Sequence, residues 1–157
     1  MDKIPLTPQG HELLTEQLHR LKHVEKPQNI RDIETAREHG DLSENAEYHA
    51  AKERQGIIAG QIQHVEDMLA RAEVIDPRKL GGNKVVFGAT VDVYDVDEDE
   101  DLTYQIVGPP EADSKKGLIS VFSPIARAMI GREVGDEVVV KTPGGERILE
   151  VVEIKFI

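Results

Sequence analysis

The chain has 157 residues, enough for one or two small domains, with 30 acidic and 19 basic side chains. The net charge of −11 argues against nucleic-acid binding over the whole surface, because Lys and Arg supply most of the affinity for phosphate. No cysteine, no signal peptide and no long apolar run are present, which excludes disulfides and membrane spans and predicts a cytoplasmic protein.

The first predicted element is a helix that begins at Thr7 and Pro8. A threonine side chain accepts the N–H groups at a helix start, and proline suits the first helical position. Two apolar stripes follow in different phases: Leu14, Leu18 and Leu21, then Ile30, Ile33 and Ala36. Pro27 lies between them and removes a backbone donor, so we expect a kink there.

A second helix, which should end near Ala72, is predicted from a longer apolar seam. Its members alternate at spacings of three and four: Tyr48, Ala51, Gln55, Ile58, Ile62, Val65 and Leu69. This period is typical of a coiled coil. Only a few residues around Gly40 separate the two helices, so they should fold back on each other as an antiparallel hairpin.

The second half of the chain is predicted to form a small sheet. Five strands, at residues 90–94, 102–107, 118–122, 137–142 and 147–157, are separated by turn signals. Ser123 and Pro124 repeat the start signal of a helix, which Gly131 ends after about two turns. The expected fold class is α+β: a helical hairpin over residues 1–76, a linker over 77–84, and a mainly antiparallel β domain with one short helix over 85–157.

The turn between the two helices carries two carboxylates, Asp41 and Glu44. Their spacing suits a variant of the capping box, in which Asp41 accepts backbone N–H bonds and Glu44 reaches back. Alternatively, both face solvent and supply oxygen ligands to Mg²⁺, which binds through one or two carboxylates plus waters and phosphates. Two carboxylates hold Mg²⁺ weakly, so a partner would supply the other ligands. Spacing alone leaves both interpretations open.

Residues 37–53, REHGDLSENAEYHAAKE, resemble the hairpin tip of the GreA family of bacterial transcript-cleavage factors. The resemblance covers essentially the whole chain, with TPQGHELL near the start, SPIARAMIG at 123–131 and VVVKTPGGE at 138–146. It implies that the hairpin enters the secondary channel of RNA polymerase as a monomer. There Asp41 and Glu44 would help hold a catalytic Mg²⁺ and its water beside the nascent RNA 3′ end. The polymerase would cleave the backtracked RNA, so the chain itself would be neither an enzyme nor the owner of the metal.

The resemblance also implies roles for residues around the tip. Arg37, Lys52 and Arg54 would contact RNA, although such residues also simply keep a helix face in solution. Asn45 and Tyr48 would shape the tip, and Tyr48 would also pack in the seam. Ser43 stands where many relatives carry lysine.

For the second domain, the resemblance implies a fold similar to that of the FKBP prolyl isomerases. The chain has few aromatic residues to line a proline-binding pocket, so isomerase activity is not expected. The domain would instead dock on the rim of the polymerase channel through Ser123 and Pro124, which are equally explained as a helix start. Phe122 departs from the polar residue usual before them. The resemblance to this family also implies DNA binding.

Two other sites are weighed and disfavoured. His39 and His49 flank the tip carboxylates, but zinc typically needs three or four protein ligands. Residues 95–101 resemble half of a calcium loop, but Glu100 replaces its invariant glycine and Ile106 its bidentate glutamate, so an exposed hairpin turn is expected.

Two rival functions remain. A regulator of the same fold could occupy the polymerase channel without stimulating cleavage, but its tip would be more acidic. A coiled-coil holdase would need an apolar grip at the end of the hairpin, where the sequence offers only Leu42 and Tyr48.

Overall fold

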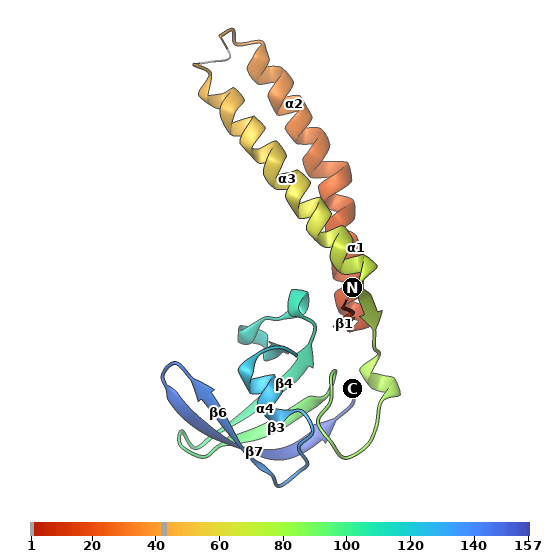
Figure 1. Ribbon diagram of the computed structural model, residues 1–157, viewed down its shortest axis with the longest axis vertical. Coiled ribbons are helices and arrows are strands. Elements are labelled where there is room, and N and C mark those ends of the chain that lie inside the picture. The colour runs from red at the N-terminus through yellow and green to blue at the C-terminus, as the bar shows by residue number, and fades with distance from the viewer. Residues whose placement is uncertain (1, 42–43) are drawn as a thin grey trace. The chain divides into compact units, whose positions relative to one another are not determined.

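The computed structural model describes residues 2–41 and 44–157, which form two compact units (Figure 1). The helical unit comprises Glu12–Arg71, and the sheet unit comprises Asp2–His11 together with Ala72–Ile157. The chain therefore passes between the units twice, once inside its first helix. The domain limits expected from the sequence stay a prediction. The α+β class is confirmed.

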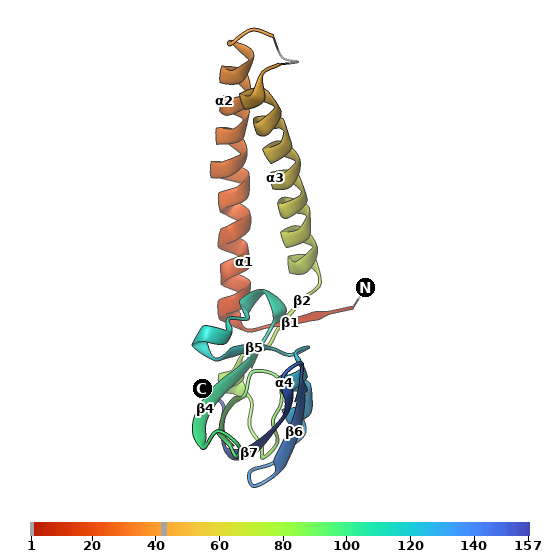
Figure 2. The same cartoon turned by 90° about the vertical axis from the view of Figure 1, so that its left-hand side faces the viewer.

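The helical unit is a hairpin whose two arms lie side by side (Figures 1 and 2). The first arm consists of α1 (Pro8–Arg20), a π-helical turn (Leu21–Glu25) and α2 (Lys26–Arg37), and the second arm is α3 (Ala46–Ala70). As predicted, Thr7 starts α1, because its Oγ1 accepts the Gly10 N–H at 3.1 Å and its carbonyl accepts the His11 N–H at 3.0 Å.

The π-helical turn accommodates the change of phase that the sequence predicts in the first arm. Here the Lys26 N–H donates to the carbonyl of Leu21, five residues earlier, so the turn contains one residue more than an α-helical turn. The arm continues as a helix through Pro27. Ile30 was expected in the buried stripe, but this prediction is wrong: Asn29 holds that position with 2% exposure, whereas Ile30 is 43% exposed.

The seam between the arms combines apolar packing with one buried polar contact. Ile33 and Ala36 of α2 are buried, as are Ile58 and Val65 of α3. The Asn29 side chain spans the seam, where its Nδ2 donates to the Ala51 carbonyl at 2.9 Å. A buried amide of this kind fixes the register of a coiled coil, since any slip leaves it unsatisfied. The predicted α3 seam is confirmed except at Gln55, which is exposed.

The sheet unit is built on five strands in the order β5-β4-β3-β7-β6. They are β3 (Thr90–Asp95), β4 (Glu100–Val107), β5 (Leu118–Ser120), β6 (Glu137–Thr142) and β7 (Gly145–Lys155), which confirms the predicted strands. Among these five strands, only β4 and β5 pair in parallel. Alternate apolar side chains of the strands, together with Ala126 and Met129 of α4 (Pro124–Met129), form the buried core.

A short parallel ribbon, which the sequence does not predict, joins the start of the chain to the sheet unit. Its strands β1 (Ile4–Leu6) and β2 (Ala72–Val74) have three residues each and are far apart in sequence. Strands this short show no readable alternation. The Ile75 N–H extends the ribbon by donating to the Leu6 carbonyl at 2.8 Å, and the Leu6 side chain is fully buried.

Glu111 holds this N-terminal segment in place. Its carboxylate accepts the Thr7 N–H and the Gly108 N–H, each at 3.1 Å, and also the Thr7 hydroxyl. Gly10 lies directly against this carboxylate, and a Cβ at position 10 would overlap the Glu111 side chain. Gly10 is therefore needed for a close approach between the first turn of α1 and Glu111.

The same substitution should have opposite effects at two helical glycines. Gly10→Ala forces Glu111 away from its three donors, so we expect a loss of about 1–3 kcal/mol of stability. Gly56→Ala, in α3, adds a methyl group that meets nothing within 4 Å, so we expect a gain of about 0.5–1 kcal/mol. Urea denaturation followed by circular dichroism measures both, and shifts of the same sign would contradict this account of Gly10.

Candidate functional site

The tip of the hairpin lies between the end of α2 at Arg37 and the start of α3 at Ala46. Asn45 is the residue that caps α3, which rules out the capping-box interpretation of Asp41 and Glu44. Both carboxylates are exposed and precede the cap. Leu42 and Ser43, which the sequence analysis singled out, lie outside the described residues. The tip carboxylates thus need an explanation other than capping of α3.

Asn45 ties the two arms together at the tip. Its Oδ1 accepts the Tyr48 N–H at 3.0 Å, and its Nδ2 donates to the Ala36 carbonyl at 2.6 Å. One side chain therefore satisfies a donor at the start of α3 and gives the Ala36 carbonyl, which also accepts the His39 N–H at 3.2 Å, a second donor. Sequence spacing did not identify this cap, because asparagine and aspartate serve equally well as N-caps.

Two further contacts join the arms beside Asn45. The Arg37 guanidinium carbon lies 6.0 Å from the centroid of the Tyr48 ring, at the outer limit of a cation–π interaction. His39 Nδ1 lies 3.3 Å from Glu47 Oε2. Tyr48 is half-buried, which agrees with its predicted place in the seam. The contacts of Arg37 with Tyr48 and of His39 with Glu47 thus join the end of the first arm to the start of α3.

The tip offers oxygen ligands but not a complete metal site. Within residues 2–41 and 44–157, no group of three or more His, Cys, Asp or Glu side chains could hold a metal ion. His39 and His49 gain no support as zinc ligands, because His39 contacts Glu47 and the His49 ring lies edge-on to Tyr48 with centroids 5.7 Å apart. Asp41 and Glu44 are hard oxygen donors of the kind that Mg²⁺ prefers, provided that other ligands come from elsewhere.

The three predicted RNA-contacting residues lie at different levels of the hairpin. Arg37 ends α2 beside Tyr48, whereas Lys52 lies farther along α3 and donates to Gln55 Oε1 at 2.8 Å. Arg54 pairs with Glu25 of the other arm at 3.3 Å. All three are exposed. Arg37 is therefore the basic residue that the structure places directly at the tip.

In the sheet unit, the predicted docking residues lie at the start of α4. Ser123 caps this helix, since its Oγ accepts the Ala126 N–H at 3.3 Å, and Pro124 is the first helical residue. Phe122 precedes them with 52% of its surface exposed. The structural explanation of Ser123 and Pro124 is thus confirmed, and their docking role stays a prediction.

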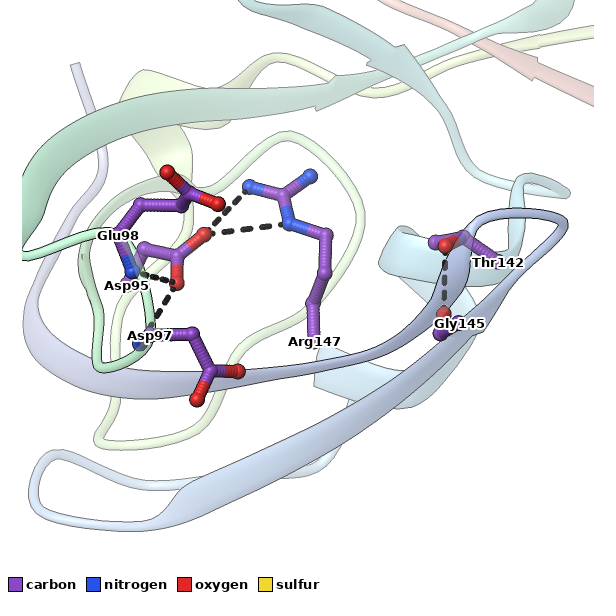
Figure 3. A network of polar contacts seen from close by, with 6 residues as sticks. All are labelled: Asp95, Asp97, Glu98, Thr142, Gly145 and Arg147. Carbon is purple, nitrogen blue, oxygen red and sulfur yellow. Dashed lines mark hydrogen bonds and ion pairs between the residues drawn. The ribbon is translucent and has the colours of Figure 1, made fainter.

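The acidic run at residues 95–101 forms a hairpin turn between β3 and β4, as expected, but its first residue is buried (Figure 3). Asp95 accepts the N–H groups of Asp97 at 3.1 Å and Glu98 at 3.2 Å, and Arg147 binds its other oxygen at 3.0 Å. The Glu98 N–H above all, and then Arg147, lower the pKa of Asp95, against the opposing effect of burial. This carboxylate therefore serves the fold and is not a calcium ligand.

Two family descriptions together match nearly the whole chain. "Transcription elongation factor, N-terminal" matches residues 4–74, and "Transcription elongation factor, GreA/GreB, C-term" matches residues 80–156. The chain belongs to the GreA/GreB family. It is 59% identical over 157 residues to the transcription elongation factor GreA of Halorhodospira halophila, with 99% of each chain covered. It is 57% identical to that of Caulobacter vibrioides, with 100% of each covered.

Solved structures of related proteins cover the chain as well. The GreA factor homolog 1 (Gfh1) of Thermus thermophilus is 31% identical, covers 98% of this chain and 99% of its own, and has a TM-score of 0.44. A GreA/GreB factor from Nitrosomonas europaea is 23% identical, with 99% and 100% covered and a TM-score of 0.43. DNA binding finds no support in these comparisons. None of the helices within the described residues has the length and apolar character of a membrane span.

The role of Asn45 in this elongation factor can be tested with two variants. Asn45→Ala removes both bonds of the side chain, whereas Asn45→Ser keeps a cap for the Tyr48 N–H but cannot reach the Ala36 carbonyl. We expect Asn45→Ala to cost about 0.5–2 kcal/mol and Asn45→Ser less. Hydrogen exchange at the Tyr48 amide should accelerate in Asn45→Ala. An exchange rate equal to that of the wild type would contradict the capping role.

The Asp95–Arg147 pair predicts a specific dependence of stability on pH. Asp95→Asn keeps an oxygen for the backbone donors but removes the charge that faces Arg147, so we expect a lower melting temperature at pH 7. Because the pKa of Asp95 is lowered, its contribution is complete above the ordinary value of about 3.9 and is lost as pH falls through the lowered value. The gap between variant and wild type should therefore close in acid.

Thermal denaturation between pH 7 and pH 3 measures this gap. Asp97→Asn is a matched control, because Asp97 lies in the same turn with an exposed side chain. A gap that stays constant down to pH 3 would show that the charge of Asp95 contributes nothing.

Proposed function

We propose that this elongation factor binds RNA polymerase and stimulates the cleavage of backtracked RNA. The observation that carries the proposal is the tip: Asp41 and Glu44 are exposed at the end of the hairpin, and the capping of α3 is done by Asn45. Membership of the GreA/GreB family supports the same role. The chemistry belongs to the polymerase, and this chain is not itself an enzyme.

The hairpin would act by carrying its tip through the secondary channel to the polymerase active site. Its second arm, α3, has 25 residues, which at 1.5 Å per residue gives a rod of about 37 Å. The Asn45 bonds and the register set by Asn29 hold the end of this rod in one arrangement. A fixed junction between Asn45 and the ends of the two arms costs less ordering on binding than a loose one would, which favours productive placement of the carboxylates.

Asp41 and Glu44 would contribute oxygen ligands to a Mg²⁺ ion that the polymerase also holds. The absence of a third ligating group near them in the described residues fits a shared site, because carboxylates alone bind Mg²⁺ weakly. When bound, this second metal would activate the attacking water and stabilise the leaving oxygen. The two side chains would hold that ion in position beside the RNA 3′ end and would balance its charge.

Other residues would assist by contacting RNA and polymerase. Arg37 at the tip, and Lys52 and Arg54 farther along α3, would interact with the displaced RNA. Asn45 and Tyr48 would shape the tip through the contacts described above. The sheet unit would dock on the rim of the channel through Ser123 and Pro124, with the exposed Phe122 ring adding an apolar contact.

The assignment of the tip carboxylates can be tested with Asp41→Asn and Glu44→Gln. Both substitutions keep the size of the side chain, and neither removes the Asn45 cap, so the folded structure should be unchanged. We expect cleavage of RNA in a stalled elongation complex to fall by at least tenfold, since a ligand that orients the metal is lost. A gel assay of RNA release, with and without the protein, measures this effect.

Binding to polymerase separates the possible outcomes. Variants that still bind polymerase but no longer stimulate cleavage support the proposal. A wild-type protein that binds polymerase without stimulating cleavage would instead be a channel regulator of the non-cleaving kind. If Asp41→Asn cleaved at the wild-type rate, the role given to Asp41 would be wrong.

A further inference from the structure

A groove lies between α2 and α3, away from the tip. It has a volume of about 390 Å³, and its wall includes the apolar side chains of Ile30, Ile58, Ala59 and Ile62. Lys26, Asn29 and Gln55 complete its lining, and of these Lys26 is charged and exposed. The volume is more than twice the ~150 Å³ of a cavity that accepts benzene, so the groove has room for a large side chain.

The groove lies where three positions carry side chains that leave the space between Ile58, Ile62 and Ile30 unfilled. Asn29 uses its side chain to bond the Ala51 carbonyl, and Gln55 turns to the surface, where it accepts a bond from Lys52. Ala59 contributes only a methyl group. Ile30 lies beside the buried stripe of Asn29, Ile33 and Ala36, and it lines the groove with 43% of its surface exposed.

The side chains around the groove leave positive charge without an acidic partner, and this indicates the charge of the ligand that would fit it. Lys22 and Arg54 pair with Glu66 and Glu25, both at 3.3 Å, whereas in the described part of the chain Arg31 and Lys52 bond only the side-chain oxygens of Gln28 and Gln55. Among the residues that the structure describes, Lys26 has no acidic side chain within ion-pair distance. An apolar groove with an unpaired ammonium group at its edge suits a ligand that joins an apolar side chain to a carboxylate.

We propose that this groove is a second contact surface for RNA polymerase. It would receive a segment of the channel wall that presents an aromatic or long aliphatic side chain beside an Asp or Glu. This inference rests on the proposed function, because a hairpin inside a protein channel presents its sides to the wall. A second copy of this chain fits less well, since face-to-face pairing would bring a second Lys26 to the groove instead of a carboxylate.

Two substitutions test the groove independently of the tip. Ala59→Phe fills the space, and Lys26→Glu reverses the charge at its edge; both side chains are exposed, so the hairpin should fold as before. We expect each variant to bind core RNA polymerase about 5- to 30-fold more weakly, the range for a contact at the centre of an interface. Higher salt should reduce the effect of Lys26→Glu but not that of Ala59→Phe.

Matched controls place the same changes outside the groove. Ala70→Phe adds the same ring at the exposed end of α3, and Arg20→Glu makes the same change of charge on α1. Fluorescence anisotropy with labelled protein measures the affinity, and circular dichroism verifies the fold. Loss of affinity in the two groove variants but not in the controls supports the proposal.

The proposal is overturned if Ala59→Phe and Lys26→Glu bind polymerase as tightly as the wild type. It is also overturned if sedimentation shows a wild-type dimer that Ala59→Phe dissociates, with no change in polymerase binding. Failure of the proposed function has a different signature: Asp41→Asn would then cleave RNA normally. The groove is tested by affinity and the tip by cleavage, so the two outcomes cannot be confused.

Discussion

The candidate site depends on where α3 begins, and one side chain decides this. Asn45 accepts the Tyr48 N–H and donates to the Ala36 carbonyl, so it closes the turn between the arms and fixes the first residue of α3. If Asp41 were the cap, α3 would begin four residues earlier and the tip carboxylates would be part of the helix start. Because Asn45 takes this place, the acidic residues precede the helix and face solvent.

Four carboxylates of this acidic chain differ in the part that they play in the fold. Glu111 and Asp95, both in the sheet unit, each hold a loop by accepting two backbone N–H groups as well as a side-chain donor. The carboxylate oxygens of these two residues already accept several hydrogen bonds within the fold, so their role is structural. Asp41 and Glu44 are exposed and do not cap α3. The distinction separates structural acids from candidate functional ones, which charge and spacing alone could not do.

Most of the fold could be predicted from the sequence because its elements are long enough to show a period. The seam of α3, the five strands of the sheet and the start of α4 at Ser123 all follow from spacing and turn signals. The misses share a physical cause: they depend on contacts between residues that are distant in sequence. Thus β1 pairs with β2, Thr7 bonds Glu111, and Asn29 replaces Ile30 in the buried stripe.

The site was predictable in part. The family resemblance named Asp41 and Glu44, but several neighbouring residues are good caps, so spacing could not tell which one starts α3. Nor could the sequence show that Arg37 lies against Tyr48 while Arg54 pairs with Glu25, because these contacts depend on how the arms face each other. The roles that the resemblance implies stay predictions, and the structure adds the contacts that these residues make.

The π-helical turn also determines the direction in which the side chains of α2 point. Each α-helical residue advances the direction of a side chain by about 100°, so the extra residue between Leu21 and Glu25 turns everything beyond it by roughly that angle. Without it, the phase of Leu14, Leu18 and Leu21 would continue through Gln28 and Asp32, and the side chains of Asn29, Ile33 and Ala36 would turn away from α3. The direction in which the first arm delivers Arg37 to the tip is therefore decided some four turns away, by the length of one helical turn.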